Sequence, residues 1–191
     1  MERREIEIVI ETLATHAFEH LCLAYHNRSE GGVIFPRYRN NKLRVSEQEM
    51  RFAFVEELRR MFPQWSYSIE TPTQEKYYFK DDVPRVDPQM GQSAQFDLTI
   101  YEGERILANI EFKAHNCPQK EMEKDFLKLT EDRKNDPNIA RVFIHIFDTF
   151  TTRTFNNVKK KVANCAGHQN VYRLYYSLQA YGGDNKIRID L

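Results

Sequence analysis

Two stretches between residues 95 and 113 alternate apolar and polar side chains. In the first stretch, the apolar positions are Phe96, Leu98 and Ile100. In the second, they are Ile106, Ala108, Ile110 and Phe112. A period of two is typical of β-strands, whose successive side chains point to opposite faces. The polar, glycine-containing segment 102–105 lies between the stretches, so the pattern predicts a β-hairpin.

The pattern also predicts the register of this hairpin. All the apolar residues of both stretches have even numbers, so they share one core only if even-numbered residues face even-numbered residues across the hairpin. The sum of two facing residue numbers must then be even, because a slip of one residue turns one strand over. A three-residue loop over 103–105 sets that number at 208. Asp97 then faces Glu111, and Gln95 faces Lys113, on the polar side of the hairpin.

Asp97 and Glu111 are candidate metal ligands, because facing carboxylates repel each other unless a cation lies between them. Mg²⁺ prefers hard oxygen ligands and commonly takes one or two carboxylates together with phosphate oxygens and waters. The alternative interpretation is a solvated polar face of an amphipathic sheet, with no metal.

The polar positions of the hairpin also match a known motif. Asp97, thirteen intervening residues and then Glu111-Phe112-Lys113 resemble the PD-(D/E)XK motif of the restriction-endonuclease-like nuclease superfamily. In that superfamily the motif sits on a hairpin as well. Phe96 stands where the motif name has proline, at a position that is loose in the family.

The rest of the chain alternates between helical and strand patterns. Apolar spacing predicts a first helix over 2–26, and Ser46 with Glu49 forms a capping box that predicts the start of a second helix. The further expected elements are strands at 65–70 and 76–80, a helix at 118–134, a strand at 140–147, a helix at 153–165, and strands at 171–178 and 186–190.

This order resembles the αβββαβ core of the nuclease superfamily from about Ser46 to Tyr176. We therefore expect an α/β fold, a mixed central β-sheet flanked by helices with an N-terminal helical extension. A single domain is expected over 1–191, in which 1–45 form the helix and a basic loop and 46–191 form the nuclease-like core.

The resemblance implies a catalytic role for the motif residues. Asp97 and Glu111 would hold Mg²⁺, or Mn²⁺ in its place, with the carbonyl of Phe112 as a further ligand. Lys113 would assist the attacking water and stabilise negative charge. A helix before the first strand supplies one more carboxylate in many members, and Glu49 is the first choice for it. Glu56 is the alternate for that helix carboxylate, and Asp87 is a rival for the first metal ligand.

Local clusters of positive charge are candidates for binding nucleic acid, although Lys and Arg together number 28, as do Asp and Glu, so the net charge is zero. The candidates are Arg37, Arg39, Lys42 and Arg44 in the loop 33–45, Lys124, and Lys159, Lys160 and Lys161, with Gln95 on the polar hairpin face. A solvated surface is the alternative for both the loop and Lys124.

Taken together, the motif and its surroundings imply a Mg²⁺-dependent deoxyribonuclease, either endonuclease or exonuclease, that acts on DNA. The alternative is a non-catalytic nucleic-acid-binding or protein-interaction module on the same fold. An odd number of cysteines, three, with no C-x-x-C pair and no signal peptide favours the cytoplasm, and no stretch reaches membrane-spanning length. A homodimer is compatible with the sequence.

Overall fold

The computed structural model describes residues 1–26, 32–80, 83–148 and 151–178. In chain order, its elements are α1 (Arg3–His26), α2 (Glu47–Met61), β1 (Ser66–Tyr78), β2 (Arg85–Val86), β3 (Gln92–Glu102), β4 (Arg105–Ala114), α3 (Gln119–Glu131), β5 (Ala140–Phe147), α4 (Thr152–Ala163), the 3₁₀ helix η1 (His168–Asn170) and β6 (Tyr172–Ser177). The strand expected at 186–190 lies outside the described residues.

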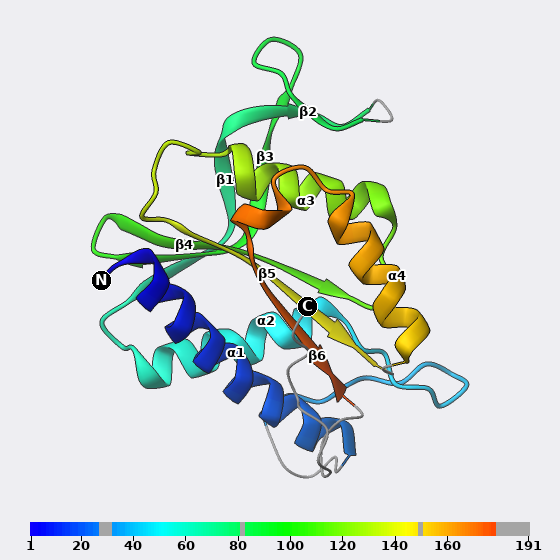
Figure 1. The fold of residues 1–191 in the computed structure, drawn as a ribbon. Coiled ribbons are helices and arrows are strands. Elements are labelled where there is room, and N and C mark those ends of the chain that lie inside the picture. Colours follow the sequence, from blue (N-terminus) through cyan, green and yellow to red (C-terminus); the bar gives the residue numbers. More distant parts are fainter. Residues whose placement is uncertain (27–31, 81–82, 149–150, 179–191) are drawn as a thin grey trace.

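The strands form one mixed sheet of six strands in the order β2-β1-β3-β4-β5-β6. Neighbours from β2 to β4 are antiparallel, whereas β5 runs parallel to β4 and β6 parallel to β5. Helices α1 and α2 cover one face of the sheet, and α3 and α4 cover the other (Figure 1). The expected α/β class, with a mixed sheet flanked by helices, is therefore confirmed. No helix in the described residues is long and apolar enough to cross a membrane.

Two apolar clusters fill the spaces between the sheet and its helices. The cluster under α1 and α2 contains the predicted core residues Leu98, Ile100, Ala108, Ile110, Phe112, Ile144 and Ile146. The ring of Phe112 packs edge-on against Phe54 of α2, with 5.8 Å between the ring centroids. The cluster under α3 and α4 contains Met122, Phe126, Phe143 and Phe147. Strand β5, between them, is buried along its whole length.

Phe96 is buried as predicted, but it belongs to the cluster under α3 and α4 rather than to the one that holds Leu98. The paired positions of β3 and β4 reach only to Leu98 and Ile110. Beyond that pair, simple alternation along β3 no longer fixes which face a side chain takes. The prediction of a single shared core was therefore wrong for this residue.

The hairpin has the predicted register but a different turn. Leu98 pairs with Ile110, Thr99 with Asn109 and Ile100 with Ala108, as predicted. Glu102 pairs with Arg105, however, so the turn contains two residues, and Gly103 adopts a positive φ of 60° there. The pairing shifts by one residue between Ile100 and Tyr101, and this β-bulge restores the predicted register.

Candidate active site

Asp97 occupies the point at which β3 and β4 separate. Its Oδ2 atom accepts a hydrogen bond of 2.8 Å from the main-chain N–H of Phe112, which fixes the carboxylate at the edge of the opening. Its Oδ1 atom lies 3.9 Å from a guanidinium nitrogen of Arg51 on α2, and its side chain is 28% exposed. Asp97 is therefore both held in place and open to solvent.

Asp97 and Glu111 lie close to each other near the point at which β3 and β4 separate. Two residues away along each strand, Thr99 donates a 3.0 Å hydrogen bond from its hydroxyl to the Asn109 side chain, which places those two side chains on one face. Asp97 lies beyond the last pair of β3 and β4, Leu98 with Ile110, and its side chain contacts the main-chain N–H of Phe112 and Arg51 of α2. The negative charge of Asp97 is one of the influences that raise the pKa of Glu111. The two carboxylates therefore lie near each other, while their direct pairing across the hairpin stays a prediction.

Glu111 is 1% exposed and lies against α3. Its Oε1 atom is 2.7 Å from the ammonium of Lys128, which is also 2.9 Å from Oδ1 of Asp125. The other oxygen of Asp125, Oδ2, lies 2.8 Å from the ammonium of Lys113. Asp125 therefore links the motif lysine on β4 to a second lysine on α3.

The pKa values of these groups follow from burial and from their neighbours. Burial raises the pKa of Glu111 well above its usual range, and the charge of Asp125 raises it further, while Lys128 opposes both. Burial alone would lower the pKa of Lys113, but the charge of Asp125 and its hydrogen bond outweigh burial and raise it. The Lys113 side chain is consequently held in its charged form.

The carboxylate of α2 nearest to the motif belongs to Glu47. Its Oε2 atom lies 3.9 Å from the ammonium of Lys113. Burial raises the pKa of Glu47, Lys113 lowers it, and the charge of Asp97 raises it again, so the three groups share one electrostatic environment. Glu47, rather than Glu49, is thus the carboxylate of α2 that lies beside Lys113.

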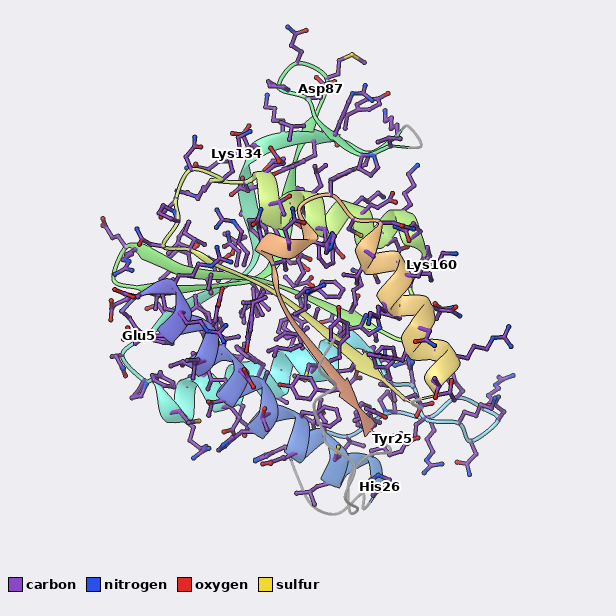
Figure 2. All side chains as sticks on the ribbon, viewed as in Figure 1. Glu5, Tyr25, His26, Asp87, Lys134 and Lys160 are labelled. Atoms are coloured by element: carbon purple, nitrogen blue, oxygen red, sulfur yellow. The ribbon has the colours of Figure 1, made fainter. Side chains whose placement is uncertain are left out.

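Glu49, by contrast, is engaged at the start of its own helix. It accepts a 3.0 Å hydrogen bond from the Ser46 main-chain N–H, which is the expected capping box, and its Oε1 atom lies 2.8 Å from Arg44. Glu56, the alternate, is exposed and lies close to Gly32. Asp87 caps a turn by accepting hydrogen bonds from Gln89 and Met90, at the tip of the arm formed by β1, β2 and β3 (Figure 2).

Two basic segments that are far apart in sequence converge on the short connection that follows Lys113. A ring nitrogen of His115 lies 2.9 Å from the carbonyl of Val45, at the end of the basic loop. Lys161 of α4 donates 2.7 Å hydrogen bonds to the Asn116 side chain and to the Cys117 carbonyl. In Figure 1, the loop and α4 accordingly lie at the carboxyl ends of β4 and β5.

The predicted nucleic-acid-binding residues divide into exposed and engaged side chains. Arg39, Lys42, Lys159 and Lys160 are exposed, and so is the side chain of Gln95. Arg37 bonds to Asn41, Arg44 pairs with Glu49, Lys161 bonds to the connection after β4, and Lys124 lies over the ring of Phe79. The engaged residues hold the basic segments in position, while the exposed ones remain the candidates for phosphate contacts.

Arg51, Asp125 and Lys128 join the site although the sequence did not single out their roles. Asp125 and Lys128 are buried on the same side of α3 as the apolar residues Met122, Phe126 and Leu129. The sequence signal for this pair was two opposite charges three residues apart on the apolar side of a helix. Such a pattern indicates a buried ion pair, because charged side chains are rarely buried unless they are paired. For Arg51, the signal was its spacing of one helical turn from Glu47.

The donor set suits Mg²⁺ only as a site with few protein ligands. Among the described residues, no three His, Cys, Asp or Glu side chains are grouped to hold a metal ion. The partly exposed carboxylate of Asp97 and the buried one of Glu111 could hold Mg²⁺, which commonly takes one or two carboxylates and keeps several waters and phosphate oxygens as ligands. The Phe112 carbonyl was the further ligand expected from the sequence. At the Phe112 main chain, the structure shows a hydrogen bond from the N–H to Asp97.

Comparison of the chain with models of protein families, with curated proteins and with solved structures gives no match.

Proposed function

We propose that this protein is a metal-dependent nuclease that hydrolyses phosphodiester bonds of DNA. The observation that carries the proposal is the proximity of Asp97 and Glu111 where β3 and β4 separate, with Lys113 two residues further along β4 and Glu47 3.9 Å from its ammonium. Paired carboxylates beside a charged lysine are suited to binding a divalent ion together with a phosphate.

The order of elements supports the same proposal. Helix α2 is followed by β1, β3 and β4, then by α3 and β5, with the short β2 inserted after β1. Apart from that insertion, the order agrees with the αβββαβ core that the resemblance implies. The candidate site lies on the hairpin of β3 and β4, where the motif is expected.

Each side chain has a role that follows from its contacts. A divalent ion held by Asp97 and Glu111 would supply Lewis acidity and lower the pKa of a bound water. Lys113, whose pKa is raised, stays positively charged at neutral pH and therefore stabilises negative charge on the phosphate rather than acting as a base. Asp125 keeps that ammonium in place, and Asp97 is kept in place by the N–H of Phe112.

The basic segments supply a path for the nucleic-acid backbone. The loop ending at Val45 and helix α4 both contact the connection that follows Lys113. Exposed lysines and arginines on these segments therefore flank the carboxylates. Such an arrangement attracts phosphates even though the chain as a whole has no net charge.

The test is DNA cleavage with supercoiled, linear and single-stranded substrates, in Mg²⁺ and in chelator. Asp97→Asn and Glu111→Gln should each lower cleavage by at least about a hundredfold. They should also remove the rise in melting temperature that Mg²⁺ gives to the wild type. Glu56→Gln is the matched control, because it neutralises an exposed glutamate of α2 and should change neither result. Unchanged cleavage in Asp97→Asn would refute the proposal.

A binding module without catalysis is the second candidate, and one observation favours it. Lys128 and Lys113 already neutralise Glu111 and Asp125 within the protein, so these two carboxylates do not require a metal ion for charge balance. This candidate predicts DNA binding that is equally tight in Mg²⁺ and in chelator, with no cleavage under either condition.

A further inference from the structure

Lys128 is surrounded by oxygen atoms in the way that a bound cation is. Its ammonium lies 2.7 Å from Glu111 Oε1 and 2.9 Å from Asp125 Oδ1, and it donates a 2.9 Å hydrogen bond to the carbonyl of Gln95. The three oxygens come from β4, α3 and β3. Lys128 is only 8% exposed, so these contacts replace most of its hydration.

The contacts of Glu111 place this ammonium directly beside the proposed metal site. Glu111 contacts Lys128 through one oxygen, and the main-chain N–H of the next residue, Phe112, donates a hydrogen bond to Asp97. In sites with two metal ions, the ions lie about 3.5–4 Å apart and share ligands of this kind. If Glu111 lay between a divalent ion and the Lys128 ammonium, the ammonium would take the position that the second metal ion has in a two-metal site.

The charges of the network agree with a single metal ion. Two groups of ion pairs meet here: Arg51 with Asp97, and Lys113 and Lys128 with Glu47, Asp125 and Glu111. With every group ionised, the four carboxylates and three cations leave one excess negative charge. One divalent ion together with one substrate phosphate brings the network to neutrality. A second divalent ion would add two positive charges to a largely buried site.

We infer that Lys128 is the permanent second cation of this site, so that the protein binds one divalent ion where a two-metal site would bind two. The inference rests on the proposed function, because it assumes that Asp97 and Glu111 hold a metal ion. Lys128 acts here as a positioning residue for Glu111, since its ammonium contacts Glu111 rather than the reacting atoms.

The number of bound ions tests the inference without measuring activity. Titration with Mn²⁺ alone, followed by electron paramagnetic resonance of the free ion, should give one ion per wild-type chain. Lys128→Met and the more polar Lys128→Gln should bind two, because Glu111, Asp125 and the Gln95 carbonyl then face an empty position. Lys124→Met, one turn earlier on α3, should still bind one. Circular dichroism establishes which variants are folded.

The outcomes separate this inference from the proposed function. Two ions in the wild type, or one ion in a folded Lys128 variant, overturn the inference even if the wild type cleaves DNA. One ion in the wild type and two in the variant, without any cleavage, support the inference and refute the nuclease. A wild type that binds no ion and cleaves nothing refutes both.

Discussion

Strand β4 packs against helices on both faces, and the two faces are built by different means. Towards α1 and α2 it presents Ala108, Ile110 and Phe112, which join the large apolar cluster. Towards α3 it presents Glu111 and Lys113, which meet Lys128 and Asp125. Glu111 and Phe112 are adjacent in sequence and are each 1% exposed, yet one is held by charge and the other by apolar contact.

The difference shows which side of the strand stabilises the fold and which specifies a site. Burial of apolar surface is favourable in almost any close-packed arrangement. Burial of charges is costly, and it is offset only when each partner is present in good geometry. A face that carries charges despite this cost is the more informative place to look for function.

The largest expected effect comes from breaking the apolar face. Phe112→Ala should lower the free energy of unfolding by about 3–5 kcal/mol, because it removes a buried ring and leaves a cavity beside Phe54. Urea denaturation followed by circular dichroism measures the change. Phe52→Ala, on the exposed side of α2, should cost within about 0.5 kcal/mol. Similar losses in the two variants would contradict the assignment of the core.

The charged face should respond differently, because its cost depends on the partner. Lys128→Met should lower the free energy of unfolding by about 3 kcal/mol, since it leaves the buried Glu111 without its cation. Glu111→Gln should cost less, because Lys128 keeps its contact with Asp125. The double variant should lose clearly less than the two single losses together. A double-mutant cycle in urea measures this coupling. Simple additivity would mean that the pair does not interact in the folded protein.

The pH dependence of stability provides a smaller test on the same side of the sheet. His145 pairs in register with Lys113, is fully buried and stacks on Phe147. Because a carbonyl only accepts, the contact with the His115 carbonyl puts the ring proton on Nε2. Burial lowers the pKa of His145 to about 4, against a usual value near 6.5.

The sign of the effect follows from proton binding. Between about pH 4 and pH 6.5 the unfolded chain binds the proton and the folded chain does not, so the contribution of His145 to stability falls as the pH is lowered. The loss should reach about 3 kcal/mol near pH 4. Denaturation of the wild type and of His145→Phe at several pH values measures it. An equal loss in both proteins would show that other groups cause it.

The sequence was sufficient for the hairpin strands β3 and β4, since period-two alternation depends only on local geometry. It predicted two strands at 65–70 and 76–80, where the structure has the single strand β1. The register of Leu98 with Ile110 was predicted correctly although the turn was not, because the bulge after Ile100 compensates for the shorter turn. The hydrophobic requirement that both strands face one core constrains the register more strongly than the turn does.

The helix contributions were harder to predict, because they depend on how the helices are placed on the sheet. Glu49 had a correct local interpretation as a capping residue, and that role engages its carboxylate. Glu47 and Asp125 gain their significance only from the approach of α2 and α3 to Lys113. Spacing along a helix identifies a face, but it does not say which strand residue that face will meet.

The smallest expected effect concerns α4, where neighbouring lysines repeat the contrast between an engaged and an exposed side chain. Lys160 is exposed on the outer side of the helix (Figure 2), whereas Lys161 bonds to Asn116 and Cys117. If the outer side contacts phosphates, Lys159→Gln and Lys160→Gln should each reduce the slope of log affinity against log salt by about one unit. Lys161→Gln should leave that slope unchanged and instead lower the melting temperature, because it releases the connection that follows Lys113.

Fluorescence anisotropy of a labelled DNA oligonucleotide at several salt concentrations gives the slopes. A reduced slope for Lys161→Gln alone would reverse the assignment of the two sides, and unchanged slopes for all three would place the DNA path elsewhere.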